Sequence, residues 1–428
     1  MLNKIRRKLS TKDNKKITSN FLYLSVVQAA NFLLPLLTFP YLVRTLGIEQ
    51  FGSIMFAQAF IVYFSMIADY GFNLSGTREI SIHRNNNKKI EQIFSSIMIA
   101  RFWLIVIGFI TMNIIVFSFE KFSQNWELYY LTYLMVIGTA LFPVWFFQGM
   151  EKMKYISILS LVAKIFFTLT IFILVSTPDD YLLVPLINSL GYIFVGIVSL
   201  WLIRKDFSIT IKYQRYKRIA MQFKRGWNIF ISKISINLYT ATNTFLLGIF
   251  TNDATVGYYA IADKVVRIVT SIFVPFYQAI YPHIVKLVKH SKDDANKFLK
   301  KVFKVVILIS SLIWIILFSF ALPLFTLVFG GEVEHSVELF KILSPLIIIL
   351  PVAYLLFNIV LLSYKMDTYF AKIYVVGAIV NLMLVILFFQ LIESKSVGIS
   401  LALLFSELTI TSLAGYVLFK SKKKYGER

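Results

Sequence analysis

Six charged residues lie near the middle of long apolar stretches of this chain, where ionised side chains are costly. They are Arg101, Lys164, Lys233, Asp263, Lys264 and Arg267. At a lipid-facing helix centre each would cost roughly 2.5–3.5 kcal/mol on insertion scales. Such groups must therefore face an aqueous cavity or one another. Five of the six are basic, which leaves a surplus near +4, and an anionic ligand is the simplest complement.

Some of these charges also allow a purely structural explanation. Asp263 and Arg267 are four residues apart, so they can pair along one face of a helix. Lys164 could extend towards the membrane surface or make a structural contact, as readily as it could bind a ligand. The surplus of the group as a whole is harder to explain in this way.

Polar residues and one proline follow helical spacing in three of the expected helices, and charged residues mark a fourth. The three sets are Gln28, Asn31, Pro35 and Thr38, then Gln58, Ser65 and Asp69, and then Lys233, Asn237, Thr240 and Thr244. Each set follows the i, i+3/i+4, i+7 spacing of one helix face. Hydrogen bonds between helices explain any single set. Polar faces on the first, second, seventh and eighth helices together favour a shared lumen.

The elements that must position these groups are long apolar helices. The chain is 58% hydrophobic and only 15% charged, which leaves too few polar side chains to cover a soluble surface. A bilayer core requires roughly 20 apolar helical residues. Twelve such segments run at about 17–43, 50–72, 91–117, 128–148, 156–175, 181–203, 226–250, 255–278, 301–323, 337–363, 368–390 and 397–420. The sequence therefore predicts an all-α polytopic membrane protein with about 12 transmembrane helices.

Positive charge is concentrated on one set of the connecting segments. Of the 44 Lys and Arg residues, 34 lie in the alternate segments that include both termini, and only three lie in the opposite loops. The positive-inside rule then places both termini in the cytoplasm. The net charge of +22 does not indicate nucleic-acid binding, because the basic residues are dispersed over loops. Weak attraction to anionic lipid headgroups is a sufficient explanation.

The predicted helices divide into two halves. We expect an N-terminal six-helix lobe (1–203), a basic cytoplasmic linker (204–225) and a C-terminal six-helix lobe (226–428), with both lobes in the same orientation. A faint internal echo at an offset of about 200 residues supports a duplication. It relates Leu46-Gly47, Phe51-Gly52 and Ala57 to Leu247-Gly248, Val256-Gly257 and Ala262.

Signatures of catalysis and of cofactors are missing. The chain has no cysteine, which excludes disulfides, thiolate chemistry and a Cys metal site. Its four histidines lie in loops without ligand spacing, and it has no GxxxxGK[ST] loop for nucleotide phosphates. No Ser-His-Asp or carboxylate-pair arrangement stands out, and a glycan ligase or polymerase would need a larger outer domain. We therefore expect transport, with no catalytic residue, metal or cofactor.

Several motifs follow one another along the chain. They are NFLLPLLTFPYLVRTLG from Asn31 to Gly47, Phe51-Gly52, DYGFN from Asp69 to Asn73, Gly76-Thr77-Arg78, WFFQGMEKMK from Trp145 to Lys154, Asn237-Leu238-Tyr239, Gly257-Tyr258-Tyr259, Ala262-Asp263-Lys264 and QAIYP from Gln278 to Pro282. In order and spacing they resemble bacterial polysaccharide-unit flippases of the Wzx, or O-antigen transporter, type. The resemblance covers essentially the whole chain.

This resemblance implies a member of the multidrug/oligosaccharidyl-lipid/polysaccharide exporter superfamily. Its members have two six-helix lobes around a central cavity, which is the MATE-like fold. The implied cargo is an oligosaccharide on undecaprenyl pyrophosphate, moved across the bacterial inner membrane by alternating access. Implied partners are this lipid-linked substrate and membrane lipids, together with a polysaccharide polymerase and a chain-length regulator. A lipid II flippase of the same superfamily usually has additional spans.

The hypothesis assigns roles to particular residues. Candidates for substrate binding are Arg101, Lys164, Lys233, Lys264, Arg267, Asn31, Asn237, Arg44 and Arg78. Asp263, together with Asp69, is a candidate ion-coupling group, because pairing of Asp263 with Arg267 or Lys264 could alternate with ligand binding. The alternative is a cation-coupled exporter of small amphipathic drugs with the same fold. Such a transporter would favour an acidic cavity, and the basic surplus argues against it.

Overall fold

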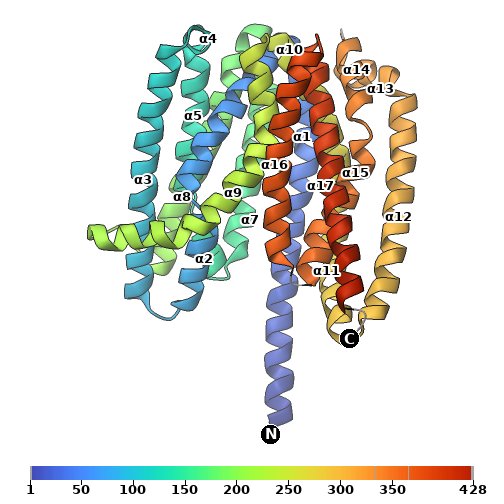
Figure 1. The fold of residues 1–428 in the computed structure, drawn as a ribbon. Coiled ribbons are helices and arrows are strands. Elements are labelled where there is room, and N and C mark those ends of the chain that lie inside the picture. The colour runs from blue at the N-terminus through green and yellow to red at the C-terminus, as the bar shows by residue number, and fades with distance from the viewer. Residues whose placement is uncertain (1, 332, 365, 426–428) are drawn as a thin grey trace. The chain divides into compact units, whose positions relative to one another are not determined.

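The computed structural model describes the backbone of residues 2–331, 333–364 and 366–425. Within these ranges, the side chains of residues 2–29, 31–32, 228, 232–241, 292, 367–368, 371, 419 and 421–425 are left out of the description. All secondary structure in the described ranges is helical, as the sequence predicts (Figure 1). The chain forms two compact units, which are described separately. Unit 1 comprises Met1–Phe39 and Phe60–Lys233, and unit 2 comprises Pro40–Ala59 and Ile234–Arg428.

The first half of the chain contains eight α-helices and one short 3₁₀ helix. They are α1 (Leu2–Asp69), α2 (Phe72–Ile82), α3 (Asn87–Ser118), α4 (Glu120–Ser123), α5 (Trp126–Leu141), α6 (Val144–Gly149), α7 (Met153–Leu174), η1 (Pro178–Leu182) and α8 (Leu183–Phe207). α1 consists of two helices that meet at Gly47, whose φ of 80° suits a glycine. The fourth predicted span breaks into α5 and α6 at Pro143, because a proline disfavours helical geometry in the residue before it.

The core of unit 1 lies between α2, α3, α6, α7 and α8. Trp145, Phe146 and Phe147 of α6 are fully buried in it. α3 and α5 pack together, as do α5 and α8, whereas the first turns of α9 (Tyr216–Phe250) run across α3 rather than along it (Figure 1). The aromatic ring of Tyr70 stacks on Phe230 of this crossing segment, at 4.3 Å between centroids.

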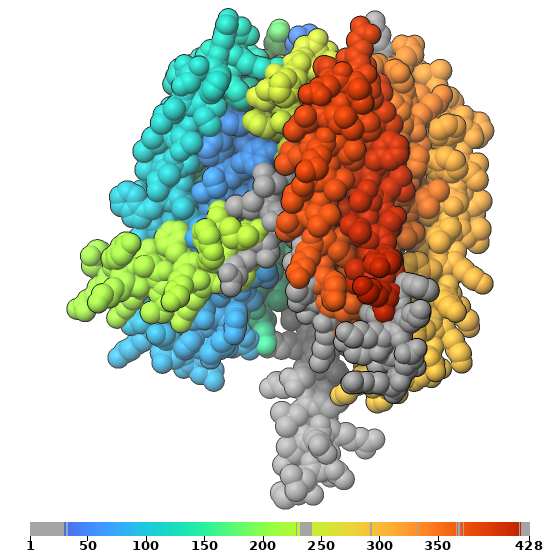
Figure 2. Space-filling view, viewed as in Figure 1, coloured from blue at the N-terminus to red at the C-terminus, as the bar shows by residue number. Residues whose placement is uncertain are grey.

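The second half of the chain continues from α9 with further helices. They are α10 (Asp253–Ser271), α11 (Phe273–His290), α12 (Lys292–Ser319), α13 (Ala321–Phe329), α14 (Glu334–Leu343), α15 (Leu346–Tyr354), the π-helical η2 (Leu355–Leu361), α16 (Asp367–Leu391) and α17 (Lys395–Tyr425). α14 and the α15–η2 helix are bent by 44° at a break that contains Pro345. α16 and α17 pack side by side along most of their length (Figure 2). The Tyr277 hydroxyl of α11 donates to the Pro351 carbonyl of α15 at 2.7 Å.

Nine helices in the described residues are long and apolar enough to cross a membrane, or ten if the bent pair is one span. Leu33–Ile82 counts once among them, although it covers the end of the first predicted span and all of the second. Part of the predicted first and seventh spans lies outside the described side chains, so the number of 12 stays a prediction. Large apolar side chains such as Phe117, Ile114 and Leu312 are exposed and suit contact with lipid. The chain is a multi-pass membrane protein.

The two segments of the internal echo pack against each other inside unit 2. Gly52 lies against the backbone of Asp253 and Gly257, and Gly257 lies against the carbonyl of Ile48. The Ser53 hydroxyl also donates to Asp253 Oδ2 at 2.5 Å. The close approach of these backbones requires residues without a Cβ, which explains the small residues of the echo. We call this contact the glycine latch.

Replacing Gly52 by alanine is expected to destabilise unit 2 by about 1–3 kcal/mol, the usual cost of overpacking. The new Cβ would overlap the Asp253 carbonyl oxygen and lie 2.8 Å from the Gly257 nitrogen, and backbone atoms cannot rotate away. Thermal unfolding of the purified protein in detergent measures the effect. Gly415→Ala in α17 is the matched control, because no atom lies within 4 Å of its added Cβ. An unchanged melting temperature for Gly52→Ala would contradict the packing.

Candidate functional site

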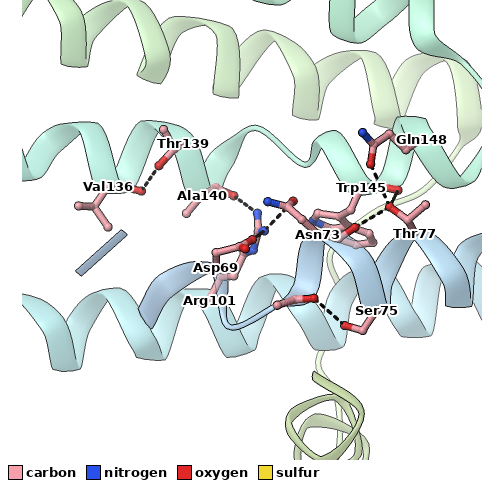
Figure 3. A network of polar contacts seen from close by, with 11 residues as sticks. Asp69, Asn73, Ser75, Thr77, Arg101, Val136, Thr139, Ala140, Trp145 and Gln148 are labelled. Atoms are coloured by element: carbon pink, nitrogen blue, oxygen red, sulfur yellow. Dashed lines mark hydrogen bonds and ion pairs between the residues drawn. The ribbon is translucent and has the colours of Figure 1, made fainter. Parts of the chain in front are cut away.

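A buried arginine joins three helices of unit 1 near the middle of the membrane segment. Arg101 of α3 donates from Nη2 to Asp69 Oδ1 at 3.0 Å and to Asn73 Oδ1 at 3.2 Å. Its Nη1 donates to the Ala140 carbonyl of α5 at 3.2 Å. Figure 3 shows these groups converging on the guanidinium from α1, α2 and α5. The ion pair with Asp69 therefore fixes the end of α1 against α3 and α5.

The turn between α1 and α2 brings the two acceptors of Arg101 together. Tyr70 and Gly71 both adopt positive φ values, 43° and 72°, and this short left-handed turn separates Asp69 from α2. At Gly71 a Cβ would also lie 2.9 Å from the Ile229 side chain. A glycine is thus required both for the backbone conformation and for the contact with α9. The Asp-Tyr-Gly sequence of the motif serves this geometry.

Two motifs that are far apart in the sequence meet beside this pair. The Thr77 hydroxyl lies 2.6 Å from the Asn73 carbonyl, and 3.2 Å from both the Trp145 carbonyl and Gln148 Oε1. Gly76 faces the Trp145 ring, where a Cβ would come within 2.7 Å. Figure 3 shows this second set of contacts along α2 and α6. The DYGFN, GTR and WFFQG motifs thus form one structural network.

Further ion pairs hold the far end of α2. Arg84 pairs with Glu151 at 2.9 Å and donates to the Gly149 carbonyl at 3.0 Å. Arg225 of α9 pairs with Glu79 at 2.5 Å. These basic side chains are used in contacts within unit 1, which ties α2 to the turn before α7 and to the crossing part of α9.

The geometry gives Arg101 a structural position. Its side chain is only 3% exposed, and both terminal nitrogens already donate to protein oxygens. Its Nε has no hydrogen-bond partner among the described residues, and the residue lines an apolar cavity of about 550 Å³ between α3 and α5. The guanidinium therefore presents few donors to a large anionic ligand.

Lys164 lies in a small pocket of unit 1. The pocket has a volume of about 150 Å³ and is lined by Leu34, Pro35, Thr38, Ala163, Lys164, Phe167, Thr168, Asn188 and Tyr192. These residues come from α1, α7 and α8. Within the described part of the chain, the Lys164 ammonium has no ion-pair or hydrogen-bond partner. The structure thus combines a cation with polar side chains in a space that can hold a small group.

The charged residues of α10 form a second cluster, in unit 2. Arg267 Nε pairs with Asp263 Oδ2 at 2.7 Å, as their spacing predicts. Glu407 of α17 and Tyr259 of α10 lie close enough to interact electrostatically with Arg267. The Arg267 side chain is nevertheless 42% exposed, and its terminal nitrogens make no hydrogen bond to any described residue. This leaves the planar fork of the guanidinium able to receive oxygens of a ligand.

Lys264 points in another direction from the same helix. Its ammonium lies 5.6 Å from the centre of the Phe51 ring and 3.8 Å from Met55 Sδ. Asp263 beside it adds a favourable electrostatic interaction. A cation over an aromatic face is stabilised by the ring electrons, so Lys264 contacts the α1 segment of unit 2.

Arg44 lies at the end of a helix. Its guanidinium donates to the carbonyls of Leu327 and Val328, with 2.9 Å between Nε and the Val328 oxygen. These carbonyls belong to the last turn of α13, where no intrahelical donor remains and a positive charge suits the helix dipole. Arg44 thus stabilises the end of α13, before Gly330.

The sequence count of intramembrane charge missed two carboxylates. Asp69 pairs with Arg101, and Glu407 lies near Arg267 in the middle of the last predicted span. Counting both lowers the surplus from near +4 to near +2. The same census of charges within spans would have found Glu407. The pairing of Asp69 with Arg101 has no local signal, because the residues are 32 positions apart.

The remaining candidates are not brought into either cluster. Arg78 is exposed on α2 and makes no hydrogen bond or ion pair with a described residue. Asn31, Lys233 and Asn237 lie outside the residues whose side chains are described. Their roles in substrate binding stay predictions. Within the described ranges, no group of three His, Asp or Glu side chains could hold a metal ion.

Solved structures with a similar fold are membrane transporters. One is entitled "Inward-facing conformation of a multidrug resistance MATE family transporter of the MOP superfamily"; it is 10% identical, has a TM-score of 0.70, and the match covers 95% of this chain and 99% of that chain. Another is "Lipid II flippase MurJ, inward closed conformation", 10% identical with a TM-score of 0.69, covering 93% and 87%. The protein therefore has the MATE-like fold of a multi-pass membrane protein.

Sequence comparison gives the family. The model of the polysaccharide biosynthesis protein family matches residues 17–288, and the chain belongs to this family. A protein of Escherichia coli (strain K12) named "Putative O-antigen transporter" is 29% identical over 394 residues, which cover 92% of this chain and 94% of the relative. A protein of Shigella dysenteriae with the same name is 29% identical over 395 residues, covering 91% and 97%.

Proposed function

We propose that this protein is a flippase that moves undecaprenyl-pyrophosphate-linked oligosaccharide units across the bacterial inner membrane. The observation that carries the proposal is Arg267, a guanidinium in the middle of a membrane segment that is 42% exposed. An unsolvated cation there would be too costly, so this surface must meet water or an anion. The family and the names of the relatives support a polysaccharide-unit cargo.

The chemistry of the cargo suits this group. A pyrophosphate diester carries about two negative charges and cannot cross hydrocarbon unaided. Arginine presents donors in a planar fork that matches phosphate oxygens, and such charge-assisted hydrogen bonds are stronger than neutral ones. Arg267 can keep its Nε on Asp263 while its terminal nitrogens bind the cargo. The lipid tail can remain in the bilayer while the sugars pass.

Energy would come from an ion gradient or from the membrane potential, by alternating access. Asp263 is the proposed coupling group, since protonation of its carboxylate would weaken the ion pair with Arg267. Asp69 is a second candidate, but its carboxylate holds the buried Arg101. The protein acts as a transporter rather than as an enzyme. Both termini would lie in the cytoplasm, and a polysaccharide polymerase and a chain-length regulator would be its partners.

Asp263→Asn is expected to abolish the dependence of transport on a proton gradient, because an amide cannot take up a proton at neutral pH. Initial rates of translocation are measured in proteoliposomes with and without an imposed pH difference. Asp253→Asn is not a suitable comparison because it alters the glycine latch, so Asp206→Asn at the end of α8 is the control. A variant at 263 that still responds fully to the pH difference would refute the coupling role.

The proposed cargo is tested by translocation of undecaprenyl-pyrophosphate oligosaccharide in proteoliposomes. We expect Arg267→Ala to slow translocation about ten- to a hundredfold, the worth of one or two hydrogen bonds to a charged group. The rate of Arg267→Lys should lie between those of the wild type and Arg267→Ala, because lysine keeps the positive charge but lacks the planar set of donors. Arg204→Ala, exposed at the end of α8, is the control. Unchanged rates for Arg267→Ala would mean that the cargo is held elsewhere.

The second candidate function is export of small cationic drugs, and it is favoured only by the fold shared with multidrug transporters. The remaining basic surplus near +2 argues against a cationic cargo. If the wild-type protein moves no lipid-linked oligosaccharide but exports a small cation, this alternative replaces the proposal.

A further inference from the structure

Lys164 lies too deep in the membrane segment to reach its surface. α7 runs from Met153 to Leu174, so 11 residues precede Lys164 in the helix and 10 follow it. At about 1.5 Å per residue the helix ends are each about 15 Å away. The flexible four-carbon stem of lysine cannot cover that distance. Extension to the interface, which the sequence left open, therefore does not explain this charge.

A structural ion pair does not explain it either. Among the described residues, no carboxylate lies within 4 Å of the Lys164 ammonium, and no hydrogen bond to it is formed. Arg101, another basic residue deep in unit 1, is by contrast paired with Asp69 and bonded to two further oxygens. Of these two cations, Arg101 is paired, whereas Lys164 has no partner among the described residues.

The surroundings of Lys164 are those of a binding pocket. Asn188 and Tyr192 face it from α8, and Thr168 lies one turn further along α7. The Thr168 hydroxyl is buried and has no hydrogen-bond partner among the described residues. Among the described residues, the Asn188 amide donates only to the sulfur of Met135, at 3.6 Å. Buried polar groups are normally satisfied, so the pocket holds unused hydrogen-bonding capacity beside an unused charge.

We propose that the Lys164 pocket binds a single negatively charged group, a carboxylate or a phosphate, of the transported head group. Its volume of about 150 Å³ corresponds to about five water molecules at ~30 Å³ each. That space accepts one acidic group with part of a sugar ring, but not a lipid chain. The ammonium neutralises the charge, while Thr168 and Asn188 bind neighbouring oxygens.

The depth of the pocket indicates where the group comes from. Headgroups of ordinary phospholipids stay outside a hydrocarbon core that is about 30 Å thick, so their phosphates remain about 15 Å from its centre. Only a group that is itself being moved across the membrane reaches Lys164. This inference rests on the proposed function and adds to it, since it makes the pocket an acidic-group subsite along the route.

The test is binding of small anions to the full-length protein in detergent, measured by thermal shift and by calorimetry. The probes are glucuronate, inorganic phosphate and, as the neutral comparison, glucose. We expect glucuronate or phosphate to raise the melting temperature of the wild type and glucose to leave it unchanged. Lys164→Met should abolish the shift, whereas Lys154→Met, on the same helix but exposed at its start, should retain it. Glucuronate alone would identify a carboxylate, and phosphate alone a phosphate.

Two further readouts separate binding from folding. Without ligand, Lys164→Met should melt at or above the temperature of the wild type, because it removes an unpaired charge from an apolar setting. A lower melting temperature would indicate a structural role and overturn the proposal. Thr168→Val keeps the charge and the shape of the pocket, and it should weaken anion binding several-fold. Equal binding by wild type and Lys164→Met would also overturn it.

These outcomes are independent of the transport assay. Anion binding that depends on Lys164 in a protein that moves no lipid-linked oligosaccharide would refute the proposed cargo and leave the anion pocket in place. Translocation that is sensitive to Arg267, together with anion binding insensitive to Lys164, would refute the pocket alone.

Discussion

Arg101→Met is expected to destabilise the folded protein by about 3–5 kcal/mol, the usual cost of removing one partner from a buried ion pair. The substitution removes the ion pair between Arg101 and the Asp69 carboxylate, which is only 20% exposed. It also removes the donors to Asn73 and to the Ala140 carbonyl, so α1, α2 and α5 lose their common anchor. Chemical or thermal unfolding in detergent measures the loss.

A double-mutant cycle separates this structural role from ligand binding. Asp69→Asn combined with Arg101→Met removes both charges, so the double variant should lose less stability than the sum of the single changes. Arg78→Met, at an exposed position without a partner among the described residues, should change stability by no more than about 0.5 kcal/mol. If Arg101→Met unfolds like the wild type but no longer transports, the guanidinium is a ligand for the cargo after all.

Locking the glycine latch is expected to stop transport. The contact lies inside unit 2, between a segment that the sequence assigns to the first predicted lobe (Ser53) and one that it assigns to the second (Asp253), and the two side chains meet at 2.5 Å. Alternating access requires the lobes to separate at each face in turn. A covalent link between residues 53 and 253 would hold one state and reduce the rate at least about tenfold, because the other state is then no longer populated.

The chain is well suited to this experiment because it contains no cysteine. Ser53→Cys and Asp253→Cys are introduced together and linked by oxidation or by a short bifunctional thiol reagent. Translocation in proteoliposomes should be lost on linking and restored by a reductant. Each single-cysteine variant should keep the same translocation rate after both treatments. A linked protein that transports at the normal rate would show that this contact persists throughout the cycle, and the alternating-access proposal would then need another gate.

The all-helical, multi-pass class of the protein could be predicted from the sequence. Apolar length, the distribution of basic residues and the Asp263–Arg267 spacing all depend on residues that are near one another in the chain. The helical fold and that ion pair are accordingly confirmed. The sequence analysis predicts one continuous span at 128–148, whereas the structure breaks it at Pro143, and a proline in a predicted span is a local signal for such a break.

The roles of the individual charges could not be predicted in the same way. The sequence pattern groups Arg101 and Arg44 with Lys164 and Arg267, because each is a cation in or beside an apolar stretch. The structure places the first against Asp69 and the second against the last carbonyls of α13, which leaves Lys164 and Arg267 with charge available to a ligand.

Composition and local spacing are enough to identify a helical, multi-pass membrane protein with costly charges inside its spans. Those properties follow from local composition, because each segment of about 20 residues must be apolar enough by itself to span the bilayer. Which of these charges are satisfied depends instead on contacts between distant parts of the chain. Partners such as Asp69 for Arg101, or Asp253 for Ser53, are 32 and 200 residues apart, and no periodicity within a helix specifies which distant segment will pack against it.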